Sequence, residues 1–143
     1  MVDRERILAR IQRVEELVTV LEGVRRGGEE RVLGDRHVQL QTERALQVAI
    51  QACIDIGAQL VAERGLPAPD DYRGVFERLE GAGMLDRRLA RQLGDAAGLR
   101  NILVHGYLDV DPARLWSSLT ELDDLRAFCA AVGLLLEDEA GSN

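Results

Sequence analysis

The chain has 143 residues, of which 46% are hydrophobic and 30% are charged, and its formal net charge is −7. This length suits one domain around one core, and the composition excludes an intrinsically disordered chain. The negative charge excludes a general attraction to nucleic acid, so any such contact requires a local basic patch. All 18 basic residues are arginines, which more often reflects genome composition than function.

The sequence predicts a soluble cytoplasmic protein. It contains no run of about eighteen apolar residues, and charged residues follow Met1 where a signal peptide would become apolar. Cys53 and Cys129 stand in apolar helical contexts without a CxxC pattern or a histidine cluster. We therefore predict buried free thiols and expect no disulfide and no metal site.

Hydrophobic periodicity and helix-ending residues predict five helices and no strand. The first helix carries apolar residues at steps of three and four from Ile7 to Leu21, and it ends at Gly27 and Gly28. After a polar stretch, the second helix covers about residues 39–63, and its apolar face is wider than one surface requires. Such a helix is either central in the bundle or covered by a second chain.

Three more helices follow a loop that contains two prolines. The fourth covers about residues 86–105, and the fifth begins with proline at residue 112. The short third helix is expected to direct four side chains inward, namely Tyr72, Val75, Phe76 and Leu79. The sequence thus predicts an all-α, up-down bundle of about five helices, in one domain over residues 1–143 with a short disordered tail over about 137–143.

The predicted fourth helix ends in the sequence RNILVHGY, residues 100–107. Asn101 and His105 are four residues apart, so they stand about 40° apart around the axis, and Arg100 stands about 100° before Asn101. The three polar side chains can therefore share one end of the helix. Position alone favours a structural role, because a histidine before a helix-ending glycine commonly satisfies free carbonyl groups.

The surrounding sequence favours a functional role instead. The stretches ERALQVAIQACIDIGAQLVAERGLPAPDDYRGVFERL and LRNILVHGYLDVDPARLW resemble the HepT-type toxins of the HEPN superfamily, and the resemblance covers roughly residues 35–117. The family signature is an arginine, four to six residues of which the first is polar, and then a histidine. In the HepT branch a tyrosine follows two residues later. Every position is matched, by Arg100, Asn101, His105 and Tyr107.

The resemblance implies a HEPN-like domain that acts as a metal-independent endoribonuclease without a cofactor, the toxin of a type VII-like toxin–antitoxin pair. It implies a homodimer with a shared cleft, in which Arg100 and His105 are catalytic and Asn101 is supporting. It also implies that a minimal nucleotidyltransferase antitoxin of the MntA type neutralises the toxin by AMPylation of Tyr107. The expected partners are therefore RNA, this antitoxin and a second copy of the chain, with no membrane.

These residue types fit the cleavage of RNA without a metal. RNA supplies its own nucleophile, the 2′-OH, so the enzyme needs a base, an acid and a cation for the charged phosphorane. Histidine exchanges protons near neutral pH, and arginine matches phosphate with a planar fork of donors. One chain offers one histidine in this motif, which is why a dimer cleft is expected to hold the base and the acid.

Two other classes of function stay open on the sequence alone. One is a non-catalytic helical module that binds a nucleotide or a nucleotidyltransferase, and the other is a helical adaptor without catalytic activity. His105 discriminates between these classes, because only catalysis requires it. Tyr107 could also anchor the following loop or stack on a base. Arg36, Arg44 and Arg114 could extend an RNA-binding surface, although exposed helix charges are the simpler interpretation.

Overall fold

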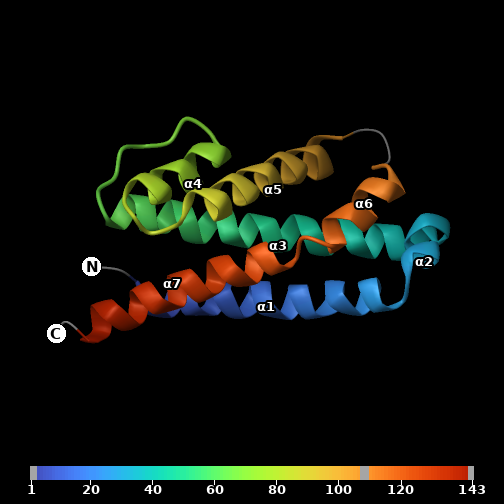
Figure 1. Ribbon diagram of the computed structural model, residues 1–143, viewed down its shortest axis with the longest axis horizontal. Helices are drawn as coiled ribbons and strands as arrows, with labels where there is room; N and C mark the ends of the chain where they lie inside the picture. The colour runs from blue at the N-terminus through green and yellow to red at the C-terminus, as the bar shows by residue number, and fades with distance from the viewer. Residues whose placement is uncertain (1–2, 107–109, 142–143) are drawn as a thin grey trace.

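The computed structural model describes residues 3–106 and 110–141, and this part of the chain is helical without any strand (Figure 1). The predicted all-α class is therefore confirmed. The helices α1, α3, α5 and α7 run alternately in opposite directions, as an up-down bundle requires. The described helices are α1 (Arg4–Arg26), α2 (Glu29–Gly34), α3 (Arg36–Glu63), α4 (Tyr72–Gly81), α5 (Arg87–His105), α6 (Pro112–Leu119) and α7 (Asp123–Gly141).

The predicted count of about five helices was too low, and α2 is the first reason. The polar stretch after α1 turns at Gly28, whose φ of 99° suits glycine, and then forms a short helix. Glu29 and Glu30 stand in its first turn, where negative charge is favourable, and Val32 is fully buried. One buried side chain in six residues is too weak a pattern to be recognised in the sequence.

The second reason is a break between α6 and α7, which the sequence predicted as one helix. The α6 helix ends where the Thr120 hydroxyl donates a hydrogen bond to the Ser117 carbonyl at 2.7 Å. Leu119 and Leu122 are both buried on the two sides of the break. Since the apolar spacing continues across it, hydrophobic periodicity did not reveal this turn.

The tail predicted to be disordered from about residue 137 is instead helical as far as Gly141. Leu136 is buried, and its carbonyl accepts a hydrogen bond from Arg4 at 3.2 Å. Arg64, next to the end of α3, forms an ion pair with Glu139. These contacts hold the acidic end of the described chain against the start of α1 and the end of α3, where composition alone suggested a solvated segment.

The helix α3 is the centre of the bundle and contacts all six other described helices. Its N-cap Asp35 accepts a hydrogen bond from the backbone N–H of His37 at 2.9 Å. Three of the side chains that made its apolar face unusually wide, Ile54, Ile56 and Val61, are buried inside the chain, and the fourth, Val48, is half-buried. The structure therefore favours the central position over cover by a second chain.

By length and apolar content, α3 is also the one helix in the described part of the chain that could cross a membrane. However, 56% of its apolar segment is buried by the protein itself. A helix that is apolar around most of its circumference is equally typical of a protein core. Its central place in the bundle thus accounts for its hydropathy.

The core also brings together the two cysteines, which are both free and buried as predicted. The Cys53 thiol shares a hydrogen bond with Cys129, and this bond together with burial raises the pKa of Cys53 well above its usual value. The same hydrogen bond lowers the pKa of Cys129. Nearby, the rings of Phe76 and Phe128 pack edge to face with centroids 5.6 Å apart.

The contact between α3 and α4 depends on Gly57, because a Cβ atom at this position would lie 2.7 Å from Cγ1 of Val75. We predict that Gly57→Ala lowers the free energy of unfolding by about 1 kcal/mol, since overpacking outweighs the better helix propensity of alanine. Urea denaturation measures this change.

The control is Gly133→Ala in α7, where an added Cβ atom meets nothing within 4 Å. This variant should gain up to about 1 kcal/mol from helix propensity alone. If both variants were stabilised equally, the close approach of α3 to α4 would not depend on the glycine.

Candidate active site

The predicted site residues Arg100, Asn101 and His105 lie in the last two turns of α5. This helix begins at the N-cap Asp86, whose carboxylate accepts a hydrogen bond from the Leu89 N–H at 2.8 Å. Its inner face packs into the core through Ala90, Leu93, Ala97 and Leu99. The helix is therefore held in place by its apolar face, which leaves Asn101 and His105 exposed and Arg100 half-buried.

Arg100 and Asn101 are in direct contact. Nη1 of Arg100 donates a hydrogen bond to Oδ1 of Asn101 at 3.1 Å. Because the asparagine amide is neutral, this contact orients the guanidinium group without cancelling its charge. Arg100 thus remains able to bind an anion such as phosphate.

Tyr72 is a site residue that the sequence interpretation missed. The sequence predicted it to point inward, but its side chain is 38% exposed, and Cζ of Arg100 lies 5.1 Å from the centre of its ring. Such cation–π contacts contribute about 0.5–1 kcal/mol at exposed sites. The only clue in the sequence is that Tyr72 directly follows the N-cap Asp71, at a helix end where a side chain need not face the core.

His105 is the last residue of α5, and its side chain is exposed. The next residue, Gly106, ends the helix as expected, and its N–H donates to the Ile102 carbonyl at 2.8 Å. His105 therefore lies at the negative end of the helix dipole and is open to solvent. Tyr107, the predicted site of AMPylation, lies outside the described residues, so this role stays a prediction.

The outer edge of α5 beside these residues is open and partly apolar. Ile102 is 53% exposed on this edge. A Cβ atom at Gly98 would meet nothing within 4 Å. This edge therefore leaves room for a second protein surface next to the motif.

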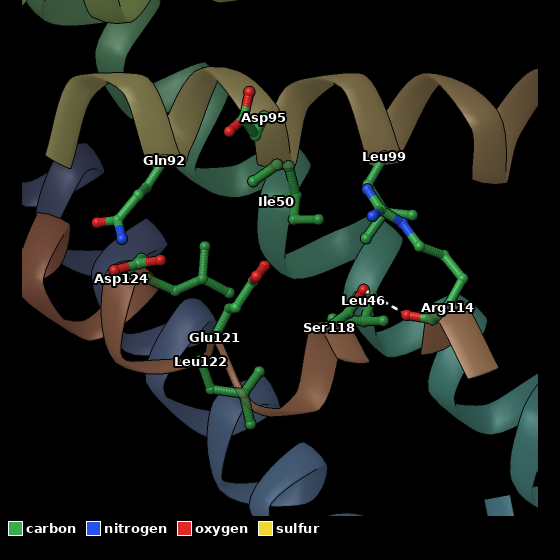
Figure 2. A pocket seen from close by; sticks show the side chains of 12 residues that line it. Leu46, Ile50, Gln92, Asp95, Leu99, Arg114, Ser118, Glu121, Leu122 and Asp124 are labelled. Carbon is green, nitrogen blue, oxygen red and sulfur yellow. Dashed lines mark hydrogen bonds between the residues drawn. The ribbon is translucent and has the colours of Figure 1, made fainter. Parts of the chain in front are cut away.

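A separate hollow lies between α3, α5, α6 and α7, and it contains neither Asn101 nor His105 (Figure 2). Three carboxylates stand around it, from Asp95, Glu121 and Asp124, and desolvation raises the pKa of Asp124. Arg114, which the sequence offered as an extension of an RNA-binding surface, lines this acidic hollow. The carboxylates would repel phosphate, so this hollow is unsuited to RNA.

No three His, Cys, Asp or Glu side chains in the described ranges are grouped so that they could hold a metal ion. At the motif, the guanidinium group of Arg100 contacts the neutral amide of Asn101, and the exposed imidazole of His105 lies on the same helix. These groups can bind a phosphate and transfer protons.

Comparison with known proteins links the chain to one family. The family model described as Ribonuclease HepT-like matches residues 7–132. A putative RNase of Archaeoglobus fulgidus is 41% identical over 80 residues, which cover 56% of this chain and 60% of the relative. A tRNA nuclease HepT of Aphanizomenon flos-aquae is 37% identical over 84 residues, which cover 57% of this chain and 56% of the relative. The chain thus matches less than two thirds of the length of either relative.

Solved structures share the fold. A tri-AMPylated HEPN toxin of Shewanella oneidensis in complex with its MNT antitoxin matches with a TM-score of 0.83 and 24% identity, over 90% of this chain and 96% of that chain. YutE of Bacillus subtilis, described as a cytosolic protein of unknown function, matches with a TM-score of 0.86 and 19% identity, over 98% and 94% of the two chains. The described bundle therefore has the helical fold of these proteins.

The position of Arg100 on the Tyr72 ring can be tested in solution. We predict that Tyr72→Ala moves the side-chain NMR resonances of Arg100 toward those of a free arginine, because the ring no longer shields them. Tyr72→Phe is the matched control, since it keeps the ring and removes only the hydroxyl. Identical Arg100 resonances in both variants would show that the ring does not hold the guanidinium group.

Proposed function

Because the chain belongs to the HepT-like ribonuclease family, we propose that it is an endoribonuclease toxin of a type VII-like toxin–antitoxin pair. The observation that carries this proposal is the geometry of Arg100. Its guanidinium group is oriented by the Asn101 amide and the Tyr72 ring, neither of which neutralises it, while His105 is exposed one turn further along α5. The names of the relatives, a putative RNase and a tRNA nuclease, support the same activity.

The proposed reaction is acid–base cleavage without a metal. One His105 takes the proton of the ribose 2′-OH, and the 2′-oxygen attacks the adjacent phosphorus. The bond from phosphorus to the 5′-oxygen breaks, and a second His105 donates a proton to that leaving oxygen. Arg100 stabilises the negative charge that develops on the other phosphate oxygens. The products are a 2′,3′-cyclic phosphate and a 5′-hydroxyl end.

The second histidine is proposed to come from a homodimer. The motif of one chain contains a single histidine, His105, whereas the proposed reaction needs a base and an acid. Burial of α3 within one chain removes one reason for expecting a dimer. The proposal therefore depends on the open edge of α5, where Gly98 and the exposed Ile102 lie one turn apart and leave room for a second copy beside the motif.

The proposed antitoxin is a nucleotidyltransferase of the MntA type, which transfers AMP from ATP to the phenol oxygen of Tyr107 with release of pyrophosphate. Tyr107 follows His105 by two residues. A nucleotide attached there would bring negative charge and bulk next to the histidine, and it would repel the RNA phosphates. A solved structure of similar fold contains a tri-AMPylated HEPN toxin with an MNT antitoxin, which supports this proposal.

We predict that expression of the chain in a bacterial host arrests growth and produces RNA fragments with 2′,3′-cyclic phosphate ends. His105→Ala should abolish the arrest and lower the cleavage rate about 100-fold or more, because the base and the acid are removed. Arg100→Ala should also abolish the arrest, because it removes the cation that stabilises the phosphorane. Growth curves and sequencing of RNA ends measure both effects.

His37→Ala is the matched control, because His37 is exposed at the start of α3 and has no part in the proposed reaction. It should arrest growth like the wild type. If His105→Ala and Arg100→Ala were as toxic as the wild type, the motif would not be catalytic and a non-catalytic nucleotide-binding module would be favoured.

We predict that incubation with an MntA-like antitoxin and ATP adds one or more AMP groups to the wild type, as intact mass spectrometry would detect. Tyr107→Phe should stay unmodified and should remain toxic when the antitoxin is co-expressed, because it lacks the acceptor oxygen. The chain has two tyrosines, so Tyr72→Phe is the control that should still be modified. Modification of Tyr107→Phe would assign the acceptor to another residue.

A further inference from the structure

We propose that a hollow between α1, α3 and α5 binds the sugar–phosphate backbone of the RNA next to the cleavage site. This inference rests on the proposed function, because it takes RNA as the ligand. Arg100 of the motif is itself part of the lining, so a strand held in the hollow would continue directly to the proposed site of cleavage. The polar and charged side chains of the lining include Arg10, Arg13, Arg44, Gln51, Asp55 and Arg100.

The hollow is a local basic patch on an acidic chain. Four arginines line it against a single carboxylate, that of Asp55, whereas the whole chain carries a net charge of −7. The arrangement is the local concentration of positive charge that an acidic protein needs in order to bind nucleic acid. Arginine also suits this role because its planar donors match a phosphate group.

The positive charge of this hollow is largely uncompensated. Arg10 donates a hydrogen bond to the neutral amide of Gln59 at 2.8 Å, and Arg44 has no carboxylate within ion-pair distance among the described residues. Arg13 lies 3.7 Å from Glu16, but both side chains are more than half exposed, so water screens this pair. The arginines therefore remain available to an anion.

Two buried polar atoms of the lining lack hydrogen-bond partners among the described residues, and together they favour RNA over a simple anion. Nε of Arg100 is an unpaired donor, and Oε1 of Gln51 is an unpaired acceptor. The Gln51 amide is oriented by its other end, because Nε2 donates to Asp55 at 2.8 Å. Unpaired buried groups are unfavourable. After a small side-chain rotation, a phosphate oxygen could accept from Arg100 and a ribose 2′-OH could donate to Gln51.

The dimensions of the hollow suit a strand rather than a single ion. Its volume is about 290 Å³, far more than one small anion fills. Along α3 the lining extends from Arg44 to Asp55, about 16 Å at 1.5 Å per residue. At a stacked spacing of about 3.4 Å per nucleotide, this length would accommodate about four or five nucleotides. No aromatic ring of the described residues lines the hollow, so we infer contact with the backbone and not with the bases.

The test measures RNA binding in a His105→Ala background, in which the RNA stays intact. A short fluorescent single-stranded RNA is titrated with this protein at several salt concentrations. Adding Arg13→Ala and Arg44→Ala together should weaken the Kd about tenfold or more. It should also reduce the slope of log K against log salt by about 0.7 for each phosphate that the protein no longer neutralises. Arg13 and Arg44 are both exposed, so the fold should be retained, as circular dichroism would verify.

The matched control is Arg114→Ala in the same background, because Arg114 is an exposed arginine that lines the acidic hollow instead. Its affinity and salt dependence should equal those of the parent protein. Gln51→Leu provides a second readout: it should reduce the preference for RNA over DNA of the same sequence, because only RNA offers the 2′-OH.

Unchanged RNA affinity after removal of the Arg13 and Arg44 side chains, or an equal weakening with Arg114→Ala, would overturn the inference. The inference would also be overturned if ATP bound as tightly as the RNA and its binding depended on the same two arginines, because the ligand would then be a free nucleotide. The proposed ribonuclease activity fails separately. If the wild type binds RNA through these arginines but never cleaves it, the proposed reaction is refuted and the proposed binding site stands. If it cleaves RNA and neither binding nor cleavage depends on these arginines, the binding site is refuted and the reaction stands.

Discussion

Burial of α3 is the constraint on which the rest of the structure depends. This helix contacts all the other described helices, and its apolar side chains face neighbours around most of its circumference. Gly57 shows how close these neighbours are, since α4 approaches α3 to a distance at which a methyl group would collide with Val75. With α3 at the centre, α5 is held along one side of it and α1 along another, and the hollow that contains Arg100 lies where these three helices meet.

The same arrangement places consecutive residues of α5 in two hollows of opposite charge. Leu99 and Arg100 are consecutive residues of α5, yet Leu99 lines the acidic hollow and Arg100 lines the basic one. Neighbouring residues on a helix point about 100° apart, so one helix can carry a wall of each hollow. An acidic protein can in this way keep a basic surface beside its motif, while three carboxylates collect on the other side of α5.

Arg100 illustrates how a charged group is oriented without being neutralised. Its hydrogen-bond partner is an amide and its stacking partner is a phenol ring, so a full positive charge remains for a ligand. A carboxylate in either place would have held the side chain equally well and would have competed with phosphate. Arg126 is a contrasting surface arginine, because its charge is compensated by an ion pair with Glu22 at 3.0 Å.

The sequence by itself determined the all-helical class, the long helices, the buried free cysteines and the position of the motif at the end of α5. These features depend on local periodicity and capping, which a sequence displays directly. The tertiary structure alone decided the length of α7, the break before it, the exposure of Tyr72 and the meeting of Arg10, Arg13, Arg44 and Arg100. Each of these depends on contacts between segments far apart in the chain, and periodicity within one segment carries no information about its neighbours in space.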